Sequence, residues 1–491
     1  MNSNIIKNKR IAIIGGGPVG LTLALLLKKK GADVCVYERE SGPDTRITGG
    51  SLDIHFQTGQ AALREAGILE EFYKISWPTS ERMVTMAGEI LGEELVQEAT
   101  KHLKPEIDRN DFRNLLCMHL GEGTVHWGSR LLSADLNQGK YRLIFENGET
   151  AFADLVIGAN GGRSNLRTMV TDAAPVYTNT YIIQGEVKNP AINCPGFLTL
   201  CKDGNMMALA EGHALATHYV ANGSIVFEIS FRQEEQWFNN NHLDVTDKAV
   251  MVDFLTKVLH NWSPKFSELV KASSRFQGYA MYYNPLEIPW KKHQNITLVG
   301  DAAHLMPPFA GVGVNIGLSD ALQLSENLTN GNFDSIDKAI ADYESKMLVY
   351  AKAALKATLH AEINIHTNKD LNAVLQSRNE WNEHLAKTPI TESSYDYHFT
   401  EVAQRAAAIS PLGDTIKFML GKKAIFIDGT GAHNIVSVED IPASCTVAAS
   451  PEDFDDLLKG KISSTMAFFT FKLKVSGDMN TAYKLKSLFD Q

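Results

Sequence analysis

The first apolar run of the chain reads Ile11-Ala12-Ile13-Ile14 and continues without a break into Gly15-Gly16-Gly17-Pro18-Val19-Gly20. Apolar residues at helical spacing follow up to residue 27, and a second β-branched run occupies residues 33–37. This order of strand, glycine turn, helix and strand predicts a βαβ unit inside a parallel sheet. Gly15, Gly17 and Gly20 keep the turn tight and let a pyrophosphate approach the amides of the helix that opens at Pro18.

Glu38 ends the second strand, at about the 20-residue spacing where an acid accepts hydrogen bonds from an adenosine ribose. A carboxylate there disfavours a 2′-phosphate, so the turn suits FAD or NAD rather than NADPH. A glycine turn without a ligand is the alternative, and the presence of strand, turn, helix and acid together disfavours it. Arg39 has two open interpretations, a contact with the adenine or a surface ion pair.

A second glycine-bearing run lies far downstream and reads Gly300-Asp301-Ala302-Ala303-His304-Leu305-Met306-Pro307-Pro308-Phe309-Ala310-Gly311-Val312-Gly313-Val314-Asn315. It follows an apolar strand at 295–299, and a helix is expected from about Val314 to Leu328. The Asp301 carboxylate can accept from ribityl hydroxyls, and the amides around Pro308, Gly311 and Gly313 can approach a flat ring. The helix opening at Val314 and Asn315 directs its positive end at the pyrimidine edge of a flavin. An N-capping aspartate before a proline-rich turn is the alternative.

These two runs together predict one FAD molecule that is held at both of its ends. A third run, from Asp154 to Arg167, repeats the order of strand, glycine turn and basic residues. Its glycines are expected beside the cofactor, and Arg163 or Arg167 would serve a phosphate or face solvent. His304 is expected to be a hydrogen-bonded turn histidine rather than a base.

Composition excludes several classes of function. The chain has 491 residues, 44% of them hydrophobic, which is enough for two or three domains with large cores. A formal net charge of -10 disfavours nucleic acid and anionic membrane surfaces as partners. The five widely spaced cysteines are expected to be reduced thiols, which indicates a cytoplasmic protein. No signal peptide and no membrane-spanning segment is expected. No histidine or cysteine pair has a metal-ligand spacing, so no metal site is expected.

The fold class is therefore expected to be α/β, with a Rossmann-type FAD-binding domain at 1–173 and 275–332. Short alternating runs after residue 176, among them Gly196–Cys201, Met206–Ala210 and Ile225–Ser230, predict an inserted antiparallel-sheet substrate domain at 174–274. Helical spacing from Ser335 to about Ile365 predicts a long bridging helix at 333–365. A polar linker at 366–398 and a small α+β domain at 399–491 complete the expected organisation.

Residues 1–365 resemble the single-component flavoprotein aromatic hydroxylases of the p-hydroxybenzoate hydroxylase type. Within that group they are most similar to the tetracycline-inactivating flavin monooxygenases, including Asn160-Gly161 where the wider family has Asp-Gly. The resemblance rests on the runs Val36–Arg39, Gly49–Asp53, Arg109–Arg113, Ile192–Phe197 and Gly300–Asn315.

This resemblance implies FAD contacts from Glu38, Arg39, Asp53, Arg109 and Asp301, a transient NADPH contact from Arg46, and substrate orientation by Gln184. It also implies that NADPH reduces the flavin and that O2 supplies one oxygen to an electron-rich phenol or enol carbon, without an obligatory catalytic acid or base. Phe309 is expected to form a wall of the substrate site. Met206 and Val226 stand where the tetracycline enzymes carry arginine and histidine, which implies a different or less polar substrate.

The last hundred or so residues resemble a sterol carrier protein domain, a family that binds apolar ligands. The resemblance rests on Leu458–Lys461 and Ala467–Met479. Five strands are expected at 418–421, 423–428, 434–438, 444–447 and 468–475, with a helix capped by Ser450. The aromatic residues Phe454, Phe468, Phe469, Phe471 and Phe489 either line a ligand tunnel or form an ordinary core.

The sequence thus indicates an FAD-dependent, NADPH-using monooxygenase that hydroxylates a polycyclic or phenolic small molecule, with tetracycline-type antibiotics as one candidate class. A flavin halogenase is disfavoured because the Trp-x-Trp-x-Ile-Pro signature is absent. The alternative from another class is a flavin-containing protein that sequesters an apolar antibiotic or lipid without turning it over.

Overall fold

A computed structural model describes residues 5–45, 50–56, 58–96, 98, 101–102, 104–202, 204–240, 243–291, 293–367, 392–460, 464, 467, 472–478, 481–482, 484 and 488–489. The chain divides into two compact units, one formed by residues 1–96 and 104–371 and the other by residues 97–103 and 372–491. Within the described part of the chain, each helix is too short or too polar to cross a membrane.

The glycine-rich runs belong to a five-stranded parallel sheet in the first unit. Its strands lie in the order β17 (Ile296–Leu298), β11 (Leu155–Gly158), β1 (Arg10–Ile14), β2 (Asp33–Tyr37) and β7 (Val125–His126). Helix α1 (Pro18–Lys29) joins β1 to β2, so the predicted βαβ unit is confirmed. Nearly every residue of β1 and β11 is buried, as expected for a parallel sheet covered on both faces.

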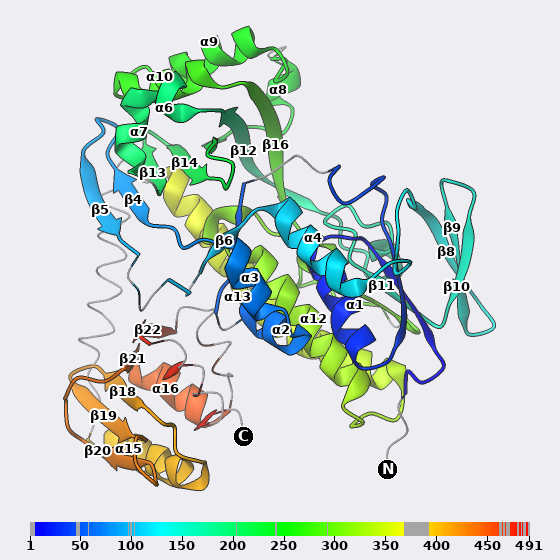
Figure 1. Ribbon diagram of the computed structural model, residues 1–491, viewed down its shortest axis with the longest axis vertical. Helices are drawn as coiled ribbons and strands as arrows, with labels where there is room; N and C mark the ends of the chain where they lie inside the picture. Colours follow the sequence, from blue (N-terminus) through cyan, green and yellow to red (C-terminus); the bar gives the residue numbers. More distant parts are fainter. Residues whose placement is uncertain are drawn as a thin grey trace. The chain divides into compact units, whose positions relative to one another are not determined.

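Several helices that come from distant parts of the chain pack beside this sheet and contact one another. Figure 1 shows α1 beside α4 (Arg109–Leu120) and α12 (Gly313–Thr329), and these helices are in contact. The long helix α13 (Ile336–Thr367) packs along α12 and reaches the second sheet of the unit, which confirms the predicted long helix. Shorter elements of the same unit are α2 (Gly59–Ala66), α3 (Leu69–Ile75), α5 (Arg167–Val170), α11 (Asp301–His304), the 3-10 turn η1 (Pro308–Ala310), the paired strands β3 (Leu52–Asp53) and β6 (Glu106–Ile107), and the small sheet of β8 (Leu131–Asn137), β9 (Lys140–Phe145) and β10 (Thr150–Ala153).

The second sheet of this unit has seven strands. They lie in the order β16 (Arg275–Tyr283), β12 (Val176–Val187), β15 (Ile225–Arg232), β14 (His213–Tyr219), β13 (Asn205–Ala210), β4 (Glu81–Val84) and β5 (Ile90–Glu94). All neighbours are antiparallel except β13 and β4, which come from distant parts of the chain and pair in parallel. The sheet is therefore the predicted antiparallel one, enlarged by an edge pair that the sequence patterns do not reveal.

One predicted strand of this region is a helix. Gly196–Cys201 lies in α7 (Pro195–Cys201), which follows the short helix α6 (Pro190–Asn193). Pro195 occupies the first helical position, where its fixed φ favours a helix. The Glu268 carboxylate accepts hydrogen bonds from the amides of Gly196 and Phe197 at 3.2 and 2.8 Å, which satisfies the open amino end of the helix.

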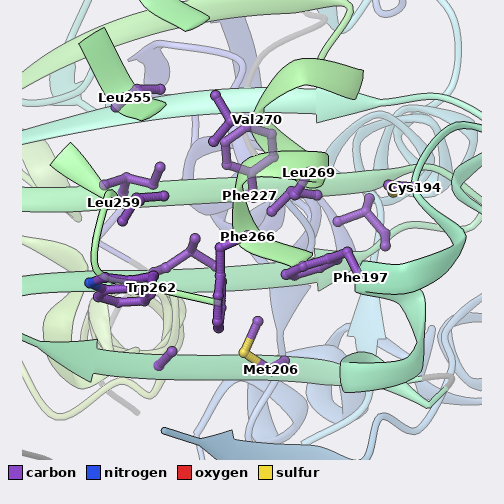
Figure 2. Packing of buried hydrophobic residues seen from close by; sticks show 14 of the residues in the cluster. Cys194, Phe197, Met206, Phe227, Leu255, Leu259, Trp262, Phe266, Leu269 and Val270 are labelled. Atoms are coloured by element: carbon purple, nitrogen blue, oxygen red, sulfur yellow. The ribbon is translucent and has the colours of Figure 1, made fainter. Parts of the chain in front are cut away.

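Helices cover one face of the seven-stranded sheet and form its core. Figure 2 shows Met206, Phe227 and Cys194 packed among side chains of α7, α9 (Lys248–Val258) and α10 (Pro264–Ala272), with Phe197, Trp262 and Phe266 stacked edge to face. The short helix α8 (Trp237–Asn240) adds Trp237 to this cluster. Because side chains alternate along a strand, the neighbours of these core residues point to the opposite face.

The second unit contains a five-stranded sheet and two described helices. The strands lie in the order β20 (Ile435–Ser437), β19 (Lys423–Asp428), β18 (Thr415–Leu420), β21 (Cys445–Ala449) and β22 (Leu473–Gly477), near the five predicted positions. Residues 468–471 of the fifth predicted strand, and residues 368–391 of the predicted linker, lie outside the described residues. Helix α16 (Pro451–Leu458) is capped by Ser450 as predicted, since its hydroxyl accepts from the Asp453 amide at 3.1 Å.

Three phenylalanines of this unit are buried together. Phe418, Phe454 and Phe489 are at most 4% exposed and meet one another with ring centroids 5.2–5.7 Å apart. Helix α15 (Glu392–Ala408) packs on the same side through Val402 and Ala406. Phe454 and Phe489 are therefore buried side by side, which both the core and the tunnel interpretation allow, while Phe468, Phe469 and Phe471 lie outside the described residues.

Candidate functional site

Glycine is needed at three positions of the amino-terminal turn, and the physical reason is not the same at all three. A Cβ on Gly15 would lie 2.3 Å from the Ala159 carbonyl oxygen, and a Cβ on Gly20 would lie 2.2 Å from the Gly15 carbonyl oxygen. Both glycines are therefore required by backbone packing alone. Gly17 is different, because a Cβ there would meet no atom within 4 Å and its φ of -79° suits any residue. Packing does not explain Gly17, but a ligand that occupies this space does.

Gly17 also marks an open helix end. It is the N-cap of α1, no side chain caps the helix, and the first turn carries no acidic residue. The unpaired amides and the positive end of the helix dipole therefore face the open space beside Gly17, an arrangement that binds a phosphate group.

Glu38 connects the end of β2 to this turn. Its carboxylate is buried and accepts from the amides of Gly16 and Glu40 at 2.5 and 3.0 Å, one on each oxygen. Each oxygen has a further lone pair, so the carboxylate can still accept from a ribose hydroxyl. Arg39 is exposed and makes no ion pair with the residues that the structure describes, so the surface ion pair is disfavoured and the adenine contact stays a prediction.

Val19 joins the two glycine-bearing runs. A Cβ on Gly300 would lie 3.3 Å from Val19 Cγ2, and a Cβ on Gly317 would lie 2.6 Å from the same atom. The first turn of α1 therefore rests directly on the turn before Asp301 and on helix α12. Two segments that are far apart in the sequence thus form one surface, as expected if a single FAD is held by both glycine-bearing runs.

The carboxylate of Asp301 begins α11 on an exposed position of this surface. Its turn is held from behind by buried polar groups. Arg167 is 4% exposed, and its Nη1 donates to the Ala302 and Ala303 carbonyls at 3.0 and 2.6 Å. Burial lowers the pKa of Arg167 to about 10. Sequence analysis left open whether Arg163 or Arg167 serves a phosphate or faces solvent. Arg167 instead binds backbone carbonyls, and Arg163 is exposed.

Arg167→Met is expected to destabilise the first unit by about 3 kcal/mol, because the carbonyls of Ala173, Ala302 and Ala303 lose the donor that Arg167 supplies. It should also weaken FAD binding, since the Asp301 turn loses its support. The exposed neighbour Arg163 provides the matched control, and Arg163→Met should leave the melting temperature unchanged. Equal melting temperatures for the two variants would show that Arg167 does not hold this turn.

His304 is part of the same support, as expected for a turn histidine. Its Nε2 lies 2.7 Å from Asp320 Oδ2, both side chains are fully buried, and the same oxygen accepts from the Gly300 amide at 2.7 Å. Tyr350 donates to the other Asp320 oxygen. Burial by itself lowers the pKa of His304, but the charge of Asp320 and the hydrogen bond to it outweigh burial, so this pKa is raised.

A raised pKa in the folded state means that the charged pair stabilises the protein below about pH 6.5, the unfolded value of histidine. This contribution is lost as the pH rises through the raised pKa of His304. His304→Gln is therefore expected to flatten the decline of the melting temperature as the pH rises above about 6.5. Melting curves across that range test this, and parallel profiles for the variant and the unchanged protein would contradict it.

Asn315 fastens strand β3 to the first turn of α12. Its Oδ1 accepts from the His55 amide at 2.7 Å, and its Nδ2 donates to the Asp53 carbonyl at 2.9 Å. The Asp53 carboxylate consequently lies beside the turn at Gly311, where a Cβ would be 3.7 Å from Asp53 Oδ2. Burial opposes ionisation of Asp53, but the charge and hydrogen bond of His55 at 2.9 Å prevail and lower its pKa.

The remaining residues expected at the cofactor lie around this junction. Arg109 donates from Nε to the Gly50 carbonyl at 2.9 Å, which brings α4 to the start of β3. Pro308 is exposed in η1, Gly311 has a left-handed φ of 66°, and a Cβ on Gly313 would meet no atom closer than 4.0 Å. Val314 follows half-buried in an uncapped helix end without acidic residues. Arg46, the expected NADPH contact, lies outside the described residues.

The seven-stranded sheet has a second face, opposite to its helix-covered core face. Gln184 and Val226 lie on that face, since their strand neighbours Ile183 and Phe227 point into the core. Met206 does not lie there, which corrects the sequence-based expectation. It is 2% exposed in the core cluster, because β13 pairs with β14 in a register that turns Met207 to the Gln184 face instead (Figure 2).

Two contacts link this face of the sheet to the cofactor surface, by which we mean the surface formed by the two glycine-bearing runs together with β3 and η1. His218 lies opposite Val226 on the neighbouring strand, and a Cβ on Gly50 would be 3.3 Å from its ring. At the other side, Ser230 Oγ lies 2.8 Å from His366 Nε2, and the His366 ring meets Phe309 edge to face at 5.2 Å. Phe309 thus lies in η1 next to the sheet, and its role as a wall of the substrate site stays a prediction.

Sequence reasoning missed His218, Glu228 and the buried acid Glu106. Glu106 is 6% exposed and accepts from Ser51 and Asn205, and burial raises its pKa. Strand pairing alone brings these side chains to the site, so their own sequence neighbourhoods carry no signal. A hollow of about 670 Å³ between α9 and α10 is lined by none of the predicted residues.

The first unit fits a bound FAD on four structural observations. They are the open space at Gly17, the uncapped amino ends of α1 and α12, and the exposed carboxylate of Asp301 beside Val19. No group of three histidine, cysteine or acidic residues that could hold a metal ion occurs among the residues described.

Comparison with known proteins agrees with this geometry. Residues 8–189 and 285–358, more than half of the chain, match the family described as "FAD binding domain", and residues 398–490 match the SCP-2 sterol transfer family. "Monooxygenase asqM" of Emericella nidulans is 25% identical over 416 residues, which cover 71% of this chain and 94% of the relative. The "6-methylsalicylate 1-monooxygenase atA" of Aspergillus terreus is 27% identical over 337 residues, covering 64% and 73% of the two chains. The solved structure of the tetracycline destructase Tet(55) superimposes with a TM-score of 0.61 at 22% identity, covering 77% of this chain and 95% of that one, which shows a shared fold.

Proposed function

Because this chain belongs to the FAD binding domain family and is an FAD-dependent monooxygenase, we propose that it hydroxylates a phenolic or polycyclic enol substrate with NADPH and O2. The observation that carries this proposal is the contact of Val19 with Gly300 and Gly317, which joins both glycine-bearing runs into one surface. The half-exposed face of the seven-stranded sheet stands against that surface.

The residues that hold FAD follow from their positions. Gly15, Gly17 and the amino end of α1 receive the pyrophosphate, and Glu38 accepts from the adenosine ribose. Asp301 accepts from the ribityl chain, while the turn at Gly311 and the amino end of α12 face the ring. Arg39, Asp53 and Arg109 add contacts along the same path. Bound there, FAD supplies the redox chemistry that transfers an oxygen atom from O2 to the substrate.

The protein groups bind and orient the substrate. Gln184, on the half-exposed face, holds a polar group of the ring system, and Phe309 excludes water from one side. Val226 offers an apolar contact in place of the histidine of the tetracycline enzymes, and His218 on the next strand offers an imidazole beside it. Met206 is removed from this set by its place in the core. Tetracycline-type antibiotics stay one candidate substrate class, supported by the shared fold with the tetracycline destructase.

NADPH serves as the transient reductant in this proposal, and Arg46 as its contact. A cytoplasmic location is supported by the five cysteines, which are all free thiols. The second unit, which matches the SCP-2 sterol transfer family, is proposed to bind an apolar or lipid ligand.

A screen of phenols and aromatic polyketides tests the function. The true substrate should accelerate NADPH consumption by the FAD-loaded protein and gain one oxygen atom by mass spectrometry. A compound that binds tightly but accelerates nothing, with no oxygenated product across the screen, would favour the alternative of a flavin-containing sequestration protein.

A further inference from the structure

One row of side chains crosses six strands of the seven-stranded sheet on its half-exposed face. The strand pairing places Gln184 between Gln277 and Glu228, Ala216 next to Glu228, and Met207 between Ala216 and Met83. Within this row only Gln184 is buried, whereas the core-facing neighbours Ile183, Phe227, Leu215, Met206 and Val84 are all buried. The row is therefore the part of this sheet that a ligand can reach.

The row lies between the two contacts that link the sheet to the cofactor surface. The next row on one side holds Val226 and His218, and His218 touches Gly50 at the start of β3. The next row on the other side holds Ser230, which bonds to His366 beside Phe309. A substrate positioned between Gly50 and Phe309 is consequently placed over Glu228 and Ala216.

The polar end of the row presents hydrogen-bond acceptors. Gln184 Nε2 donates to Glu228 Oε1 at 2.9 Å, so one of the two N–H groups of the Gln184 amide is already used. Its carbonyl oxygen and the second oxygen of Glu228 still have lone pairs for a ligand. Gln277 is held by Tyr279, whose hydroxyl donates to its Oε1 at 2.5 Å.

Glu228 is also the carboxylate of this face without a cationic partner among the described residues. Arg275 is paired with Glu186, its Nε lying 2.8 Å from the Glu186 oxygen. Arg232 lies 3.9 Å from Glu362, which is 1% exposed and receives a hydrogen bond from Thr178 at 2.5 Å. The two arginines of this face thus balance other acids, and the charge of Glu228 is directed to the ligand.

We propose that Glu228, held by Gln184, selects substrates that carry a protonated amine and rejects those that carry a carboxylate. The amine binds at the acceptor end of the row, and the apolar part of the substrate lies along Ala216, Met207 and Met83. This inference rests on the proposed function, because it assigns the substrate class of that same site. A carboxylate that a ligand covers discriminates between opposite charges, since a like charge beside it is destabilising.

Binding of three matched phenols to the FAD-loaded full chain tests the proposal. Tyramine, its neutral alcohol analogue tyrosol and para-hydroxyphenylacetate differ in the charge of one group, and each is titrated by its effect on the flavin absorbance. The unchanged protein is expected to bind tyramine about tenfold more tightly than tyrosol and to bind para-hydroxyphenylacetate most weakly. Glu228→Gln keeps the hydrogen bond to Gln184 and removes the charge, so the preference for tyramine over para-hydroxyphenylacetate should fall at least tenfold.

Asp253→Asn is the matched control, because this exposed carboxylate on α9 pairs with Lys257 away from the row. It should leave all three affinities unchanged. The proposal is overturned if the unchanged protein does not prefer tyramine, or if the preference is the same in Glu228→Gln. Binding is measured without NADPH, so a failure to find any oxygenated product would count against the proposed function and not against this charge selectivity.

Discussion

Gly20→Ala is expected to destabilise the fold, whereas Gly17→Ala is expected to weaken FAD binding and leave the fold intact. At Gly20 the added methyl group would lie 2.2 Å from the carbonyl oxygen of Gly15, a backbone atom that cannot move away without opening the turn. Such overpacking costs about 3 kcal/mol or more, so this variant should unfold at a much lower temperature with or without FAD.

Gly17→Ala should leave the cofactor-free protein almost as stable as before, within about 1 kcal/mol, because its φ is allowed and the space is open. Its FAD affinity should fall roughly 100-fold, since the methyl group occupies the space that the pyrophosphate needs. Melting curves of both variants and titration of the stripped proteins with FAD measure the two effects. If Gly17→Ala binds FAD as tightly as the unchanged protein, the pyrophosphate does not lie at this turn.

Asp301→Ala is expected to release FAD. The carboxylate is exposed at the start of α11, and Arg167, His304 and Asp320 hold the backbone of its turn. A hydrogen bond to a charged group contributes about 1.5–3 kcal/mol, and its loss should lower FAD affinity between about 10-fold and 100-fold.

Asp334→Ala is the control for this variant, because Asp334 is an exposed carboxylate of the same unit that pairs with Lys338. It should retain full flavin. Asp301→Asn, which keeps an acceptor oxygen, is expected to lie between the unchanged protein and Asp301→Ala. Full flavin occupancy in purified Asp301→Ala would remove Asp301 from the cofactor site.

The cofactor half of the site was predictable because its signals are local. Gly15, Gly17, Gly20 and Glu38 sit at spacings that a single βαβ unit imposes, and Asp301 follows a strand of the same sheet. The adjacency of the two runs also follows, since the carboxyl ends of parallel strands meet at one edge. The structure added the reason for each glycine, and it assigned Arg167 to backbone carbonyls rather than to a phosphate.

The substrate half was less predictable. Residues 196–201 alternate like a strand but form a helix, because Pro195 and the capping carboxylate of Glu268 favour a helical start. Met206 was expected at the substrate and lies in the core. A shift of one residue in strand register exchanges the two faces of a strand, and nothing within β13 itself specifies that register.

The amino-acid sequence alone therefore indicated an FAD-binding monooxygenase, and it predicted the glycines and acids of the cofactor site from local strand, turn and helix patterns. Tertiary structure decided which side chains share the half-exposed face of the seven-stranded sheet. Gln184, Glu228, Ala216 and Met207 become one row only when four strands pair in a particular register, and that pairing is set by the burial of Ile183, Phe227 and Leu215 on the opposite face. Long-range burial selects the register, and the register selects the residues that a ligand can touch.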